Sequence, residues 1–277
     1  MKRLILLAPL ALLAAACGGG SSKGPTILPA KIFTLASFHP AAPAVAGQPT
    51  NVSFVIRQPD GTPLTKFKTG PGPHTGVHLI IVRRDLATII HTHPPVGPGG
   101  VISVPVTFAE PGPYRVVVDV YPATGAQPNF QLFGSLRVAG AYHPQPLGSA
   151  SSVVVDGYRI TLHGHPALHA VQAGALNVTV DGPDGKPAVF TPWFGALAHA
   201  IFFRQGSLDY FHTHVCGATT TGCTSVLGNP KVAGSSTTPG VLKVGVLVPV
   251  PGTWRLFLQC KVAGHVLTAP FTLEVKP

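Results

Sequence analysis

The sequence predicts an all-β protein built from two tandem Ig-like β-sandwich domains, and three observations support this prediction. The 277 residues include 32 Gly and 30 Pro, which interrupt the chain too often for long helices. Each half of the chain contains about seven apolar runs of strand length, bounded by Gly, Pro and Asx turns, as in β-sandwiches. Both halves also repeat the same motifs in the same order, which indicates a duplicated domain.

The apolar runs of the first half define its expected strands. They fall near residues 31–37, 50–57, 77–83, 87–93, 101–108, 113–121 and 130–138. An aromatic residue follows a Pro-Gly turn at the sixth run, Tyr114 in the first copy and Trp254 in the second. Ig-like folds often place a corner aromatic at this point. We therefore expect one sandwich at residues 31–140 and another at 151–277, joined by a linker at 141–150.

Three motifs carry the duplication. A turn signature at residues 58–63 recurs at 182–187, and a Pro-Gly-aromatic motif at 111–116 recurs at 251–256. Between them, an apolar strand with one histidine precedes His-Thr-His at identical spacing in both copies. Because the order of the motifs is also the same, a chance match is excluded.

The first 16 residues are typical of a signal peptide. Lys2 and Arg3 precede an apolar run at residues 4–16, which is too short to span a bilayer as a mature helix. The run ends in Ala-Ala-Ala before Cys17 and resembles the lipobox of bacterial lipoproteins, although Ala14 stands where that motif more often has Leu. The resemblance implies that Cys17 is lipidated after cleavage. The alternative is an ordinary secretory peptide, in which Cys17 has no such role.

The segment after the signal peptide, residues 17–30, begins with Gly and Ser and has the composition of a flexible tether. We therefore expect an exported protein that is lipid-anchored to the bacterial cell membrane and faces the extracytoplasmic side.

The chain is basic, with a formal net charge of +10. Loss of the signal peptide leaves about +8. The basic residues are scattered singly or in pairs, without the basic stripe and interleaved aromatic residues that binding to nucleic acid needs. The sequence therefore gives no support for a nucleic-acid partner, and it does not indicate a protein partner.

Six histidines form the candidate site. They are His78, His91 and His93 in the first copy and His199, His212 and His214 in the second. A two-residue hairpin turn at residues 84–85 would place His78 opposite His91, with His93 on the same face because side chains alternate. A turn at 205–206 would do the same in the second copy. The pattern thus predicts three converging imidazoles in each domain.

Imidazole nitrogens are suitable ligands for copper and zinc, and three of them with an open position describe a labile or a catalytic metal site. The only methionine is Met1, so a blue-copper site with an axial Met is excluded. The alternative is that the histidines are structural, as hydrogen-bonded members of a half-buried hairpin.

Three cysteines lie in the second copy, and an exported protein meets an oxidising compartment. Cys216 and Cys223 bracket a small loop and are the favoured disulfide pair, whereas Cys260 lies in an apolar strand. Cys216 follows His214 by two residues and is alternatively a sulfur ligand of the second site. His265, in the last hairpin, is another possible extra ligand.

The pattern of a histidine-bearing strand, a short turn and His-x-His resembles a family of bacterial secreted Ig-like domains, largely uncharacterised and often linked to envelope metal handling. The six histidines above carry the resemblance in both domains. The chain departs from the pattern at Val215, where a Pro commonly follows the second His-x-His. The resemblance implies the hairpin, the sandwich and a role with metal.

The sequence therefore favours an envelope lipoprotein that binds or buffers copper or zinc. The alternative is a structural or adhesion-type tandem Ig-like module. We do not expect an enzyme, because the chain has only nine acidic residues to supply a general base. Moreover, Asp85 of the first turn corresponds to Gly206 in the second.

Overall fold

The structure is a computed structural model that describes residues 32–125, 128–164, 166–218 and 232–277. The predicted signal peptide, the tether with Cys17, and Cys223 lie outside these ranges. Within them, no helix has the length and apolar character needed to cross a membrane.

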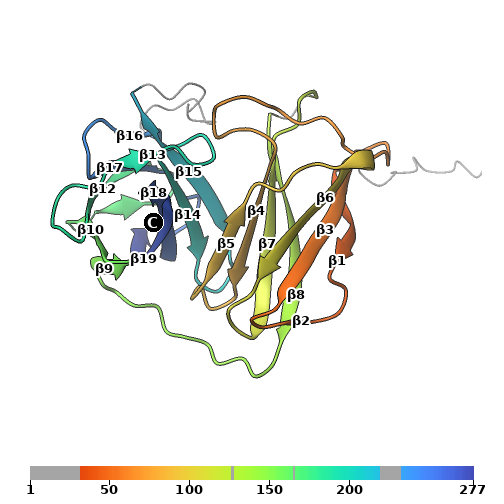
Figure 1. Cartoon of the computed structure of the whole chain (residues 1–277), viewed down its shortest axis with the longest axis horizontal. Coiled ribbons are helices and arrows are strands. Elements are labelled where there is room, and N and C mark those ends of the chain that lie inside the picture. Colours follow the sequence, from red (N-terminus) through yellow and green to blue (C-terminus); the bar gives the residue numbers. More distant parts are fainter. Residues whose placement is uncertain (1–31, 126–127, 165, 219–231) are drawn as a thin grey trace, which may run out of the picture. The chain divides into compact units, whose positions relative to one another are not determined.

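The first domain has two sheets of mainly antiparallel strands (Figure 1). A hydrophobic core lies between them. One sheet has the strand order β1-β3-β6, and the other has the order β2-β8-β7-β4-β5, in which β2 pairs in parallel with β8. A short 3-10 helix at Pro98–Gly100 precedes β6. The strands are β1 (Thr34–His39), β2 (Ala44–Val45), β3 (Pro49–Arg57), β4 (Val77–Arg83), β5 (Ile89–Thr92), β6 (Val101–Thr107), β7 (Gly112–Val120) and β8 (Phe130–Ala139).

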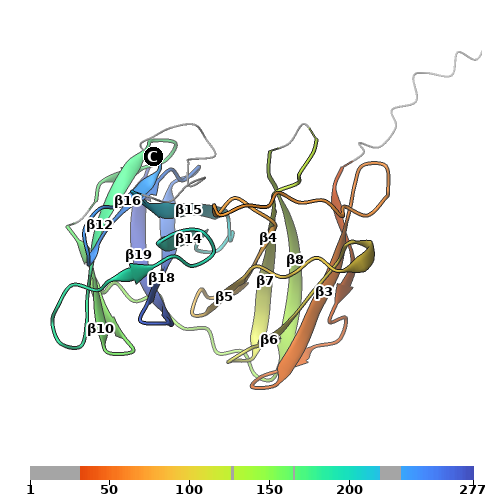
Figure 2. The same cartoon turned by 45° about the horizontal axis from the view of Figure 1, so that its top comes forward.

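The second domain repeats this strand order and adds three strands, β9, β13 and β16, of which β13 pairs with β18 (Figure 2). Its order is β11-β19-β18-β14-β15-β16-β17-β12-β10-β9, and β16 pairs with both β15 and β17, so that the sheet is continuous. The strands are β9 (Ser152–Val155), β10 (Tyr158–His163), β11 (Leu168–His169), β12 (Gly174–Asp181), β13 (Phe190–Thr191), β14 (Ala198–Arg204), β15 (Tyr210–Gly217), β16 (Gly234–Ser236), β17 (Val241–Val246), β18 (Gly252–Val262) and β19 (His265–Lys276).

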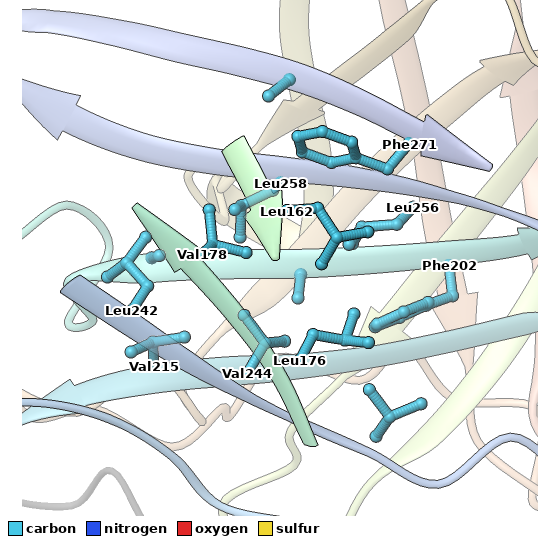
Figure 3. Close-up of a cluster of buried hydrophobic side chains, with 14 of the residues drawn as sticks. Leu162, Leu176, Val178, Phe202, Val215, Leu242, Val244, Leu256, Leu258 and Phe271 are labelled. Atoms are coloured by element: carbon cyan, nitrogen blue, oxygen red, sulfur yellow. The ribbon is translucent and has the colours of Figure 1, made fainter. Parts of the chain in front are cut away.

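Each domain has its own apolar core, formed by alternate residues of facing strands. In the first domain, Phe54 of β3 packs with Leu79 of β4 and Val116 of β7. In the second, Figure 3 shows Val178, Phe202 and other labelled side chains of the core. The predicted all-β fold with two Ig-like sandwiches is confirmed.

The two domains share their corner contacts as well as their strands. The Tyr114 hydroxyl donates to the carbonyl of Glu110 at 2.8 Å, and Trp254 Nε1 donates to the carbonyl of Val250 at 3.1 Å. Both aromatic residues thus anchor to the backbone four residues upstream, as the corner motif predicts.

Strands β4 and β14 are buried on both faces. Every residue of β4 is buried, including His78 and Arg83. One face of each strand packs in the core of its own domain. The opposite face contributes to a separate apolar cluster that combines residues of both domains. Its members are Ile80, Val82, Leu86, Val117, Ile201, Phe203 and Phe257. The outer faces of the two histidine-bearing sheets therefore pack against each other.

The segment at residues 141–150 contacts both domains. The amide of Gln145 donates to Asp85 Oδ2 at 2.8 Å in the first domain, and the carbonyl of Gly148 accepts from Arg255 Nη1 at 3.4 Å in the second. The predicted linker is thus hydrogen-bonded along its length.

Candidate metal centre

The hairpin register differs from the predicted one by two residues in both domains. Ile80, rather than His78, lies opposite His91, and His199 lies opposite His214 rather than His212. The turns are longer than two residues; in the first, the amide of Leu86 donates to the carbonyl of Arg83. A shift of two leaves each side chain on its predicted face, because side chains alternate with period two.

The six histidines form one assembly that both domains share, not a separate cluster in each domain. Three sets of three histidines have one ring nitrogen each within 4.8 Å of the others, and two of these sets combine the two domains. The sets are His78, His91 and His93; His78, His212 and His214; and His91, His199 and His212.

Gln259 of the second domain orients His91 of the first. Gln259 Nε2 donates to Thr268 Oγ1 at 3.0 Å, so its amide oxygen faces His91 Nδ1, also at 3.0 Å. Because an oxygen can only accept, His91 Nδ1 carries the proton. His91 Nε2 is therefore left with its lone pair directed at the cluster.

The same argument assigns the proton of His199. Its Nε2 lies 2.9 Å from the carbonyl oxygen of Trp193 and donates to it, which leaves the lone pair on Nδ1. That Nδ1 lies 3.3 Å from His212 Nε2. Two ligands at 2.0–2.1 Å from a tetrahedral zinc are separated by about 3.3 Å, so this pair already has the spacing of a metal site.

Asp119 occupies in the first domain the position of Gln259 in the second. Asp119 pairs with His78 across the strands, as Gln259 pairs with His199. The Asp119 carboxylate is 4.0 Å from His212 Nδ1 and accepts from Gln131 Nε2 at 3.1 Å. Burial raises the pKa of Asp119 to about 6. Each domain thus presents one polar side chain to a histidine of the other.

Several imidazole nitrogens at the centre are buried without a hydrogen-bond partner among the described residues. The carbonyl of Pro73 lies beside His78 but makes no hydrogen bond of suitable geometry with it. The unpartnered atoms are both ring nitrogens of His78, Nε2 of His91, His93 and His214, and Nδ1 of His212.

Burial keeps the six imidazoles neutral. It lowers the pKa of His93 to about 2 and that of His199 to about 4. Burial, reinforced by neighbouring imidazoles, also holds the pKa of the other four well below the ordinary value. Neutral imidazole is the form that binds metal, so no proton has to leave a charged ring at neutral pH.

An aromatic turn of the second domain covers one side of the cluster. The ring of Phe194 stacks on His93 with centroids 3.8 Å apart, and Trp193 meets His91 edge to face at 5.4 Å. Gly195 follows in a left-handed conformation, with φ at +77°, against the backbone of residues 71–73. These rings exclude water from the cluster on that side.

Sequence reasoning missed three polar members of the site, His74, Asp119 and Gln259. His74 Nε2 lies 3.2 Å from His214 Nδ1, and the sequence marks it only as a single histidine in a Gly/Pro-rich loop. Asp119 had a clearer signal, since an acidic residue within the run Val116–Val120 requires a buried partner.

The extra ligands suggested by the sequence do not join the cluster. Cys216 is disulfide-bonded, so its sulfur is not available to bind metal. Cys260 is a free buried thiol, so it is not the disulfide partner of Cys216. That partner lies outside the described residues. His265 is exposed and belongs to none of the three histidine sets found among the described residues.

A family profile described as a domain of unknown function, DUF8832, matches residues 36–132 and 152–277. The chain belongs to the DUF8832 family. The match includes the six clustered histidines of this DUF8832 protein, and it leaves out the predicted signal peptide and the whole predicted linker.

No curated protein sequence matches this DUF8832 protein. Solved structures give weak overall matches. Invasin, a bacterial integrin-binding protein, is 15% identical with a TM-score of 0.23, over 88% of this chain and 38% of invasin. The chain thus spans less than half of that protein. Fibronectin(III)-like modules of CbhA from Clostridium thermocellum are 10% identical, with a TM-score of 0.23, over 88% and 93% of the two chains. Domains 4 and 5 of the S-layer protein SbsC are 11% identical, with a TM-score of 0.23, over 88% and 98%.

Proposed function

We propose that this protein is a lipid-anchored protein of the bacterial envelope that binds or buffers a copper or zinc ion at the shared histidine cluster. Export and the anchor at Cys17 rest on the sequence alone. The proposed role is non-catalytic, and the ion-binding part rests on the geometry of the six histidines.

The unpartnered nitrogens are the observation that carries the proposal. A buried polar group without a hydrogen bond costs about 1–3 kcal/mol of stability, and this cluster contains six such imidazole atoms. Each neutral ring has one nitrogen lone pair, and a metal ion would engage those lone pairs directly. The cost of burying them in the metal-free protein would then be offset when the ion binds.

The chemistry of the ligands narrows the choice of ion. Neutral imidazole nitrogen is a borderline ligand that suits zinc and copper, whereas magnesium and calcium prefer oxygen. The set of His91, His199 and His212 fits best, because Gln259 and the carbonyl of Trp193 already fix two of its rings. Partners of this kind, which orient a ligand through its second nitrogen, are typical of metal-binding histidines.

A purely structural role for the histidines is the competing function. It explains the bonds of His91 to Gln259 and of His199 to Trp193. It does not explain His78, which is fully buried and carries two unpartnered nitrogens. A structural histidine is expected to satisfy at least one of its ring nitrogens.

Calorimetric titration of the mature protein with Zn²⁺ and with Cu²⁺ tests the proposal. We expect saturable binding at micromolar metal, and a loss of at least 100-fold in affinity in the double variant His91→Ala/His212→Ala. His163→Ala is the matched control, since His163 is exposed on β10 and lies outside the three sets. Absence of saturable binding, or equal affinity of the double variant and the control, would exclude the metal function.

A further inference from the structure

We propose that His74 is the residue through which a metal ion passes from solution into the buried cluster. This inference rests on the proposed function, and it adds a seventh histidine and a route. The route is needed because His78, His199 and His214 are almost completely buried.

A surface cleft reaches the cluster at His74. The cleft has a volume of about 350 Å³ and is formed mainly by the loop at residues 67–75, with Ala123 on the other side. Of the described residues that line the cleft, His74 is the one histidine, and it is only partly buried. Lys68 lies farther along the same lining, and its ammonium group donates to the carbonyl of Pro128 at 3.1 Å.

His74 contacts the cluster directly. Its Nε2 is 3.2 Å from His214 Nδ1, which is close to the separation of two ligands on one tetrahedral ion. The two rings meet edge to face with centroids 4.8 Å apart. His214 in turn belongs to the set with His78 and His212. An ion held between His74 and His214 therefore lies beside a residue of that set.

The loop that carries His74 is fixed in place by the backbone. The amide of Lys68 donates to the carbonyl of Tyr121, and the amide of Gly76 donates to the carbonyl of Lys68. The ring of His74 also packs on that of Tyr121, with centroids 5.4 Å apart. The hydrogen bonds of the loop and the contact with Tyr121 thus fix the position of His74 between the cleft and the cluster.

The transfer is a sequence of ligand exchanges without a change of oxidation state. A hydrated ion in the cleft loses water as His74 Nε2 binds it, and His214 Nδ1 then binds the same ion. The proton of the hydrogen bond between the two rings leaves to water in the cleft as the ion takes its place. His74 finally dissociates when His78 or His212 completes the set.

The opposite side of the cluster supports this assignment. His93 and His212 are also partly buried, but the side chain of His212 is only 2% exposed. Phe194 stacks on His93 with an interplanar angle of 6°. An ion that entered at His93 would have to displace this ring. The His74 side presents a cleft instead.

Stopped-flow mixing with Cu²⁺ tests the inference, because Cu²⁺ quenches tryptophan and Trp193 lies against His91 and His199. We expect His74→Ala to slow both quenching by Cu²⁺ and its reversal by chelator at least tenfold. Equilibrium affinity should stay within about threefold, since a residue on the route alters both rates alike. His163→Ala serves as the exposed control, and thermal melts without metal verify that each variant is folded.

Two outcomes would overturn the inference while leaving the metal function intact. Unchanged rates in His74→Ala would mean that the ion uses another route, such as the one beside His93. A large loss of affinity at an unchanged association rate would make His74 an ordinary ligand. By contrast, failure of the wild-type protein to bind Cu²⁺ in the calorimeter would remove the proposed function itself.

Discussion

At the spacing that relates His78 to His199, residues 72–74 of the first domain correspond to residues 193–195 of the second. The first domain has Gly-Pro-His in this loop, and the second has Trp-Phe-Gly. The loop of the second domain places two aromatic rings against the histidines. The loop of the first domain forms a cleft and carries His74. The two copies thus share the same strands, but the loop of the second domain shields the histidines from solvent and the loop of the first leaves a cleft beside them.

A second difference lies within the cluster. Asp119 faces His212, whereas the corresponding Gln259 faces His91. Among the residues that the structure describes, only the His212 side of the assembly therefore has a buried carboxylate. Together, the two differences show that the sheets preserve the histidine geometry while single positions around it have diverged in charge and size.

The largest expected effect is acid destabilisation of the metal-free protein. The six histidines have folded pKa values below the unfolded value of about 6.5, so below that pH the unfolded state binds more protons. Their stability contribution is complete above pH 6.5 and is lost as the pH falls. At pH 5.5 the loss is about 1.4 kcal/mol for each histidine. Urea unfolding at a series of pH values would measure it.

Asp119 changes the stability of the fold with pH in the opposite direction to the histidines, which distinguishes its side of the cluster from the side with Gln259. Its folded pKa of about 6 exceeds the unfolded value, so between pH 6 and 3.8 the folded state binds the extra proton and gains stability on acidification. Asp119→Asn should therefore make the acid loss steeper. Stability that stays flat from pH 7 to 5 in both proteins would contradict the buried, neutral state of the histidines.

The next largest effect is a loss of stability on substitution of Gly195, which lies in the loop of the second domain that carries the two aromatic rings. A Cβ on Gly195 would lie 2.5 Å from the backbone carbon of Gly72, and φ is +77°. We expect Gly195→Ala to cost about 2–4 kcal/mol, since the strain of the left-handed conformation adds to the clash. Gly206→Ala is the matched control, with φ at +87° and no atom within 4 Å of the added Cβ. Thermal melts that show equal losses would mean that the two loops are not tightly packed.

The smallest effect separates the carboxylate side from the amide side. Asp119→Asn should weaken zinc or copper binding by about 10-fold, because a carboxylate near a ligating histidine increases its basicity and balances the charge of the ion. Gln259→Glu should strengthen binding by a few fold, since it gives His91 a carboxylate as well. Competition with a chromophoric chelator measures both. Equal affinities in the two variants would remove any role of these positions in binding.

The strands and the shared face of the histidines could be predicted from the sequence, because alternation and turn chemistry are local signals. The register could not, since the length of the turn at residues 83–88 depends on the left-handed conformation of Leu86, which an aliphatic residue rarely adopts. The two-residue shift left His78 on its predicted face of the sheet, but His78 no longer lies directly opposite His91.

The sequence does contain a signal that the two histidine-bearing strands are covered on both faces. Residues 79–82 and 200–203 are apolar without alternation, which is typical of a strand buried on both faces and not of a half-buried hairpin. What covers the second face is a tertiary contact, so no local pattern could show that the cover is the other domain. Gln259 was missed for the same reason, whereas Asp119 had a local signal as an acidic residue in an apolar run and only its partner was hidden.

The reciprocal contacts between the domains, His91 with Gln259 and His212 with Asp119, are those of an isologous interface, in which the same patch is used twice. In a homodimer of single domains, every substitution at such a patch appears on both sides of the axis. Joining the two copies in one chain removes this restriction. A carboxylate can then be kept on one side and an amide on the other, and a covered loop can face an open one. The tandem chain thus permits an asymmetric centre that identical subunits could not encode.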